Sequence, residues 1–156
     1  MVKVRQAGIG DLDALVPLFD AYRQFYKRDT DPPAVREFLF KRFQHQQSVI
    51  FIAHDEEGAA IGFTQLYPLF SSLTLVRTFV LYDLFVRPAA RGTGLGEALV
   101  QALMADARAL GYRELKLDTL ARMTEARALY SSLGFEESDA YYHNPIADVV
   151  YMRLAL

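Results

Sequence analysis

Three closely spaced glycines between an apolar segment and a helical pattern constrain this chain more than any other feature. The loop is Arg91-Gly92-Thr93-Gly94-Leu95-Gly96; it follows the apolar segment 81–86, and apolar residues recur at helical spacing from Leu95 to Leu110. A strand, a glycine loop and a helix N-terminus together favour anion binding, because free N–H groups and the positive end of the helix dipole point to one place. The pattern predicts a site for a phosphate-bearing ligand, with a merely glycine-rich turn as the alternative.

Two common phosphate-binding motifs do not fit this loop. A P-loop carries Lys and then Ser or Thr after its last glycine, whereas Gly96 is followed by Glu97 and Ala98. The dinucleotide motif G-x-G-x-x-G would need a third glycine where Glu97 or Leu99 stands. The expected ligand is therefore neither a nucleoside triphosphate nor NAD.

Length and composition favour one folded domain, and the net charge argues against two classes of partner. The chain has 156 residues, of which 52% are hydrophobic, so we expect a single domain over residues 1–156 with a real core. A net charge of −2 argues against nucleic acid or an anionic membrane as the main partner. There is no cysteine, which excludes disulfides and cysteine metal ligands. The N-terminus does not resemble a signal peptide, and we expect a cytoplasmic protein.

Hydrophobic periodicity and turn residues predict an α/β (α+β) fold with a mixed, mostly antiparallel sheet flanked by helices. Asp11 and Asp31 are expected to cap the first two helices, Pro68 to end a strand, and Thr124 to cap the last helix. The expected order is β-α-α-β-β-β-α-β-α-β-β. The strands are expected at 2–5, 48–54, 60–67, 73–86, 114–118, 135–142 and 149–154, and the helices at 12–26, 32–46, 95–110 and 124–133.

A second motif follows the glycine loop at a distance of about thirty residues. The segment Ala128-Leu129-Tyr130-Ser131-Ser132-Leu133-Gly134-Phe135 resembles the pattern A-x-L-Y-x-x-x-G-F, and the glycine loop resembles Arg/Gln-x-x-Gly-x-Gly/Ala. Both motifs, in this element order, resemble the GNAT superfamily of N-acetyltransferases over essentially the whole chain. Within that superfamily, the chain resembles a branch of small bacterial single-domain enzymes.

The resemblance implies that the phosphate ligand is acetyl-CoA. The backbone amides of Arg91, Gly92, Thr93, Gly94, Leu95 and Gly96 would hold its pyrophosphate, with the Thr93 hydroxyl as an additional donor. The Arg91 guanidinium would lie near a phosphate or face solvent. The backbone of Leu84, Phe85 and Val86 would bind the pantetheine amides, as an added strand binds a sheet edge.

The resemblance also implies the groups that move protons. Tyr130 would protonate the departing thiolate, with a role in packing as the alternative. Asp83 is the candidate base, and a structural carboxylate or deprotonation by water are the alternatives. No metal is expected. Many relatives carry Asn where this chain has Met123, which puts one cofactor contact in doubt; Asp118 or Thr119 could replace it.

The predicted function is acetyl-CoA-dependent transfer of an acetyl group to a primary amine of a small molecule or peptide. The amine would attack directly in a ternary complex; the alternative is a non-catalytic acyl-CoA sensor. Asp29, Asp31 and Glu37 could attract a cationic acceptor or form a solvated rim, so the acceptor stays open. Nucleic acid and membranes are not expected as partners, whereas a homodimer would be in keeping with relatives.

Overall fold

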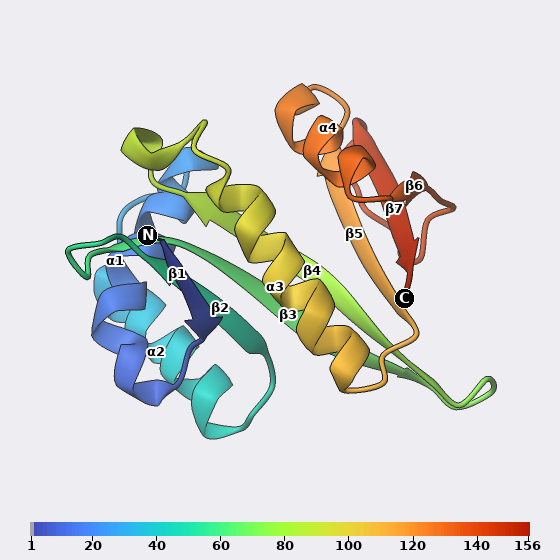
Figure 1. The fold of residues 1–156 in the computed structure, drawn as a ribbon, viewed down its shortest axis with the longest axis horizontal. Helices are drawn as coiled ribbons and strands as arrows, with labels where there is room; N and C mark the ends of the chain where they lie inside the picture. The colour runs from blue at the N-terminus through green and yellow to red at the C-terminus, as the bar shows by residue number, and fades with distance from the viewer. Residues whose placement is uncertain (1) are drawn as a thin grey trace. The chain divides into compact units, whose positions relative to one another are not determined.

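The computed structural model describes residues 2–156, which form the mixed α/β fold that the sequence predicts (Figure 1). Its sheet has the strand order β1-β2-β3-β4-β5-β7-β6. The β4–β5 pair is parallel, whereas β1–β2, β2–β3, β5–β7 and β6–β7 are antiparallel. The strands are β1 (Lys3–Gln6), β2 (Val49–His54), β3 (Ala60–Ser71), β4 (Val76–Val86), β5 (Glu114–Leu120), β6 (Glu136–Glu137) and β7 (Val149–Ala155). The α-helices are α1 (Leu12–Phe25), α2 (Pro32–Gln44), α3 (Leu95–Ala109) and α4 (Thr124–Ser132).

The chain divides into two compact units, and the division cuts through strands β3 and β4. The first unit contains the described residues up to Tyr67 together with Asp83–Leu103. The second contains Pro68–Tyr82 and Met104–Leu156. The glycine loop and Asp83 therefore belong to the first unit, and Tyr130 belongs to the second.

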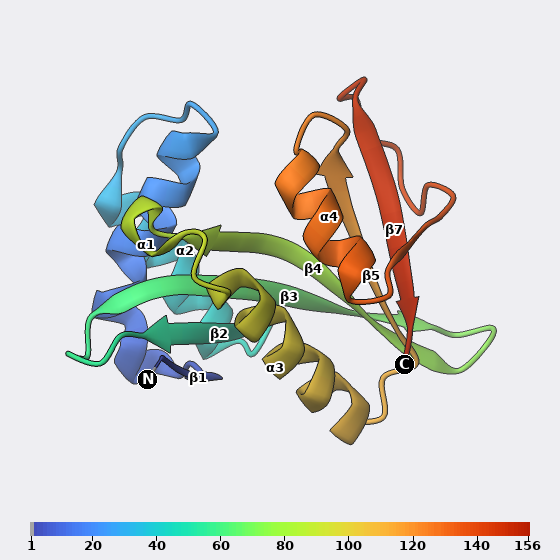
Figure 2. The same cartoon turned by 45° about the horizontal axis from the view of Figure 1, so that its top comes forward.

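In the first unit, helices cover both faces of the strands. Helices α1 and α2 lie on one face and α3 begins on the other, as the two views show (Figures 1 and 2). Strand β2 is accordingly buried on both faces, including Ile50, Phe51 and Ile52, as expected for a strand between two helical layers. The core on the α1–α2 face joins apolar side chains of α1, α2, β2 and β3 with Phe85 of β4.

In the second unit, β5 lies between β4 and β7. Thr78 to Leu81 of β4 pair with Glu114 to Leu117, and β5 pairs with β7 along its whole length. Leu115, Leu117 and Thr119 are buried, whereas the residues between them are half-buried. This alternation is the period of two that the sequence shows in this segment.

Two predicted strand boundaries are wrong. Strand β3 continues through Pro68 to Ser71; its register with β2 ends at Leu66, so the missing N–H of Pro68 removes no bond to that neighbour. The strand expected at 135–142 is reduced to Glu136–Glu137. Its later residues leave the ladder, and the hydroxyl of Tyr141 donates to Asp118 instead.

The predictions of the helix caps are confirmed in part. The Asp31 carboxylate accepts the Ala34 amide at 3.2 Å, as expected of a cap. Asp11 precedes α1, but its carboxylate accepts bonds from Gly8 N and Arg5. Met123, rather than Thr124, occupies the cap position of α4. Among residues 2–156, none of the helices combines the length and apolar character needed to cross a membrane.

Gly62 of β3 is the position where the packing of α3 leaves least room. A Cβ placed there would lie 3.0 Å from the Phe85 carbonyl oxygen and 3.3 Å from Leu95 Cδ2. We expect Gly62→Ala to destabilise the fold by about 1–3 kcal/mol, because α3 and the β4 backbone must move to admit the methyl group. Urea unfolding measures the loss, and Gly10→Ala, where a Cβ meets nothing within 4 Å, is the control. Equal stability of the two variants would contradict this account.

Candidate active site

The glycine loop presents a row of free amides at the start of α3. Gly92 and Gly94 have φ of 77° and 82°, a region that other residues enter only at a cost. The Arg91 amide donates to Pro88 O and the Ala98 amide to Gly94 O. Among the described residues, the amides between them have no backbone acceptor, as is usual for a helix N-terminus. The loop therefore offers consecutive N–H donors in the field of the α3 dipole.

The two polar side chains of the loop stabilise the loop itself. Arg91 Nε donates to Val86 O at 3.0 Å, and its guanidinium lies 5.6 Å from the ring centroids of both Phe25 and Phe85. The Thr93 hydroxyl donates to Ala90 O. Its single proton is thus engaged, so it is not the free additional donor that the sequence suggested.

The end of β4 continues beyond its pairing with β5. The ladder between the two strands ends at Leu81, whereas β4 extends to Val86. Phe85 is buried and its ring lies 6.4 Å from Phe63, so its side chain belongs to the core. The backbone of Leu84, Phe85 and Val86 is what this segment can offer to a ligand, although Val86 O already accepts one bond from Arg91.

Asp83 is a half-buried carboxylate with three defined contacts inside the first unit. Gln65 Nε2 donates to Asp83 Oδ2 at 2.8 Å, the Tyr22 side chain also hydrogen-bonds to the carboxylate, and the Thr64 hydroxyl donates to Asp83 O at 2.8 Å. Ser48 Oγ lies 2.8 Å from Gln65 Oε1 and donates to it, which directs the amide N–H₂ group toward Asp83.

Burial controls the protonation of this carboxyl group. Desolvation raises the pKa of Asp83 above its ordinary value, and the hydrogen bonds from Gln65 and Tyr22 oppose part of that rise. A carboxyl whose pKa is shifted toward neutrality can take up a proton more readily than an exposed one. The roles of Gln65 and Ser48 were missed in the sequence, although a glutamine within the apolar segment 60–67 was a usable signal.

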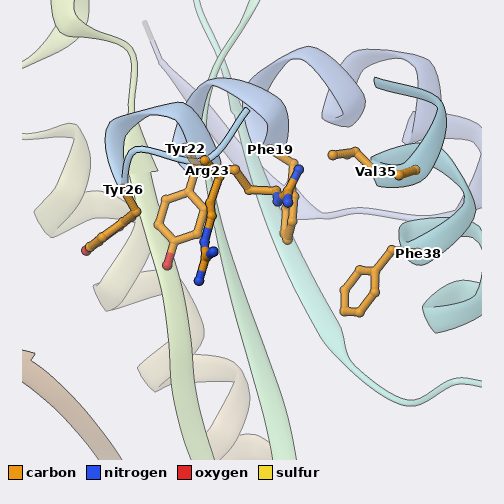
Figure 3. A pocket seen from close by; sticks show the side chains of 8 residues that line it. Phe19, Tyr22, Arg23, Tyr26, Val35 and Phe38 are labelled. Carbon is orange, nitrogen blue, oxygen red and sulfur yellow. The ribbon is translucent and has the colours of Figure 1, made fainter. Parts of the chain in front are cut away.

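An apolar pocket of about 470 Å³ lies between α1 and α2 in the same unit (Figure 3). Phe19, Val35 and Phe38 form its apolar walls, and Arg23 and Arg28 contribute charge. Tyr22 also lines it and connects it to Asp83 through the hydrogen bond described above. Its volume falls within the range of small-molecule sites.

Tyr130 lies on α4 in the second unit and is 5% exposed. Its ring centroid is 5.7 Å from that of Phe135, so both members of the second motif pack together. The two side chains that could replace the missing asparagine both contact neighbouring side chains of the second unit. Thr119 Oγ1 contacts Met123 Sδ at 3.9 Å, and Asp118 accepts the Tyr141 hydroxyl at 3.0 Å.

The model of the Acetyltransferase (GNAT) family matches residues 14–135. The chain belongs to the GNAT acetyltransferase family. It is 42% identical over 142 residues to the uncharacterized N-acetyltransferase YhfO of Bacillus subtilis, covering 91% of this chain and 95% of that one. A crystal structure described as a probable acetyltransferase superposes with a TM-score of 0.86 at 38% identity, over 94% of this chain and 99% of the other. Membership confirms the predicted family and fold, and supports an enzyme that transfers acyl groups.

A more distant structure of the same fold contains acetyl-CoA. The structure of yncA from Salmonella typhimurium with its cofactor acetyl-CoA has a TM-score of 0.77 at 20% identity, over 99% of this chain and 94% of the other. GNAT enzymes use acetyl-CoA, and free amides at a helix N-terminus suit its phosphate groups. In the described part of the chain, no group of three or more His, Asp or Glu side chains is placed to hold a metal ion.

Gly94 tests whether the loop conformation matters for binding. At φ 82° a side chain is strained although space is available, so we expect Gly94→Ala to destabilise the protein by about 1–2 kcal/mol and to weaken acetyl-CoA binding. Gly94→Asn should be more stable than Gly94→Ala, because asparagine enters this region more easily. Thermal unfolding and titration calorimetry measure both effects. Unchanged affinity in Gly94→Ala would exclude the loop from acetyl-CoA binding.

Proposed function

We propose that the chain is an acetyl-CoA-dependent N-acetyltransferase that acetylates a primary amine by direct attack in a ternary complex. The observation that carries the proposal is the presence, in one compact unit, of a free-amide loop and of a half-buried carboxylate of raised pKa whose hydrogen-bond partner Tyr22 lines a pocket. The loop suits the pyrophosphate of the donor, and the pocket suits an acceptor. Family membership supports the reaction type.

For the donor, we assign the amides of Gly92 to Gly96 to the pyrophosphate and the backbone of Leu84, Phe85 and Val86 to the pantetheine. The glycines let the main chain approach the phosphates closely. The donor supplies a thioester whose carbonyl carbon is open to attack by an amine. The oxyanion that develops there needs a donor, and a backbone amide near Leu84 is our candidate.

For the acceptor, we assign the base to Asp83. A neutral amine forms a bond to the acetyl carbon, the carbon–sulfur bond breaks, and the surplus amine proton passes to Asp83. The departing sulfur takes a proton from Tyr130, whose phenol O–H is the general acid of this step. The products are an acetylated amine and the free thiol of CoA.

Thiol release across a panel of primary amines tests the proposal. The chain contains no cysteine, so a thiol reagent detects only the CoA that is formed. Amine-dependent thiol release is the expected result. A thermal shift by acetyl-CoA without thiol release from any amine would instead support a non-catalytic acyl-CoA sensor.

The pH dependence of kcat/KM tests Asp83. Because the base must be ionised, activity should rise with pH through the raised pKa of Asp83, and Asp83→Asn should lose this acidic limb together with most of the rate. Tyr22→Phe should move the limb to higher pH, because one of the hydrogen bonds that lower the pKa is removed. An unchanged limb in Asp83→Asn would assign deprotonation to water.

Stability provides a second reading of the same group. Folding raises the pKa of this carboxyl group, so the group does not lower the free energy of unfolding below its ordinary pKa of about 3.9. As pH rises from there through the folded-state pKa, the free energy of unfolding falls. Asp83→Asn should therefore raise Tm relative to the parent near neutral pH, and the difference should disappear in acid.

Tyr130→Phe tests the proton donor. The ring and its packing on Phe135 are retained, so Tm should change little, whereas kcat should fall about 100-fold or more when general acid catalysis is lost. Tyr112→Phe is the matched control, because Tyr112 stacks on Phe79 and is not assigned to the site. Full kcat in Tyr130→Phe at every pH would leave Tyr130 as a packing residue.

A further inference from the structure

The charges of the pocket between α1 and α2 identify the class of acceptor. Its lining contains two arginines, Arg23 and Arg28, and no carboxylate. Among the described residues neither guanidinium has an ion-pair partner. A positively charged and otherwise apolar pocket is complementary to a ligand that is apolar and anionic.

Three acidic residues near the pocket, Asp20, Asp31 and Glu37, form contacts elsewhere in the protein. Asp20 accepts the Thr30 hydroxyl at 2.6 Å and the Asp31 amide at 2.9 Å. Asp31 caps α2, and Glu37 pairs with Lys41 at 2.9 Å. Of the three carboxylates that suggested a cationic acceptor from the sequence, Asp31 and Glu37 thus stabilise the start and the surface of α2.

The end of α1 brings the main chain of Arg28 back to that of Arg23. The Arg28 amide donates to Arg23 O at 3.0 Å and the Lys27 amide to Gln24 O at 2.9 Å, while Lys27 has φ of 62°. These bonds form a Schellman motif, which folds Arg28 back over the last turn of α1. Figure 3 shows the Arg23 and Tyr22 side chains extending in the same direction from this turn.

The opposite side of the pocket is aromatic. The rings of Phe19 and Phe38 lie 6.0 Å apart between centroids, and Phe38 is 39% exposed. An apolar or aromatic ligand body would cover these rings and remove them from water. The Tyr22 hydroxyl, bonded to Asp83, marks where the reacting amine would approach the base.

We propose that the acceptor is a primary amine that also carries a carboxylate and an apolar body, that is, an apolar or aromatic amino acid or a short peptide of such residues. Arg23 and Arg28 bind the carboxylate, for which the planar guanidinium is suited. Phe19 and Phe38 contact the apolar body. The inference rests on the proposed function and names its substrate class.

Matched amines test the carboxylate directly. Phenylalanine is compared with phenethylamine, which lacks only the carboxylate, and leucine with isoamylamine; spermidine represents cationic acceptors. We expect kcat/KM to be about tenfold or more higher for the carboxylated member of each pair, as a charge-assisted contact provides. Equal rates within the pairs, or a preference for spermidine, would overturn the inference while leaving acetyl transfer intact.

Binding distinguishes failure of the inference from failure of the proposed function. If no amine releases thiol, acetyl transfer is contradicted, and the pocket is then tested by thermal shift with N-acetylphenylalanine against N-phenethylacetamide in the presence of CoA. A larger shift with the carboxylated compound supports a carboxylate-binding site in this pocket. Equal shifts, or none, overturn it.

Substitutions of Arg23 and Arg28 test where the carboxylate binds. Arg23→Gln and Arg28→Gln should each raise KM for phenylalanine about tenfold and leave the KM values for phenethylamine and acetyl-CoA unchanged. Arg108→Gln is the matched control, because Arg108 also lies in the last turn of a helix but not in the pocket. If the Arg23 and Arg28 variants raised KM for acetyl-CoA instead, these guanidinium groups would serve the phosphates of CoA and the inference would be wrong.

Discussion

The partial desolvation of one carboxylate, Asp83, organises much of the first unit. Removing an ionisable group from water is costly, and the cost is met here by contacts from two separate elements. Tyr22 reaches it from α1 and Gln65 from β3, while Thr64 bonds to its backbone carbonyl. These contacts fix the position of the first helix relative to the end of β4, and they give a sheet residue the protonation behaviour that a base needs.

Aromatic rings pack around the Tyr22 side chain that bonds to Asp83. The Tyr22 ring lies 5.8 Å from Phe63 and 6.2 Å from Phe85 between centroids, and Phe19 lies 5.4 Å from Phe63. The same ring of Tyr22 forms part of the pocket wall. One tyrosine therefore belongs to the core, the candidate acceptor site and the hydrogen bonding of Asp83, which explains why the core and the site cannot be separated here.

Local patterns were sufficient for the element order, the glycine loop and the family, because those depend on periodicity and on glycines at fixed spacing. The features that the sequence did not predict depend on contacts between residues that are far apart in the chain. Gln65 meets Asp83 across 18 positions of the sequence, and Tyr141 leaves its expected strand for Asp118 across 23 positions. Similarly, Pro68 could remain in β3 because the register with β2 had already ended. Asp20 illustrates the same limit, since its bonds to Thr30 and to the Asp31 amide span 10 and 11 positions.

Arg91 touches three parts of the first unit: it bonds to the end of β4, and its guanidinium lies over Phe25 of α1 and Phe85 of β4. An anion that settles on the glycine loop therefore changes the surroundings of the helix whose last turn carries the pocket. Thermodynamic linkage is reciprocal, so any gain in acceptor affinity produced by the bound donor equals the gain in donor affinity produced by the acceptor. Arg91 is thus the side chain through which binding of the proposed donor and of the proposed acceptor would depend on each other.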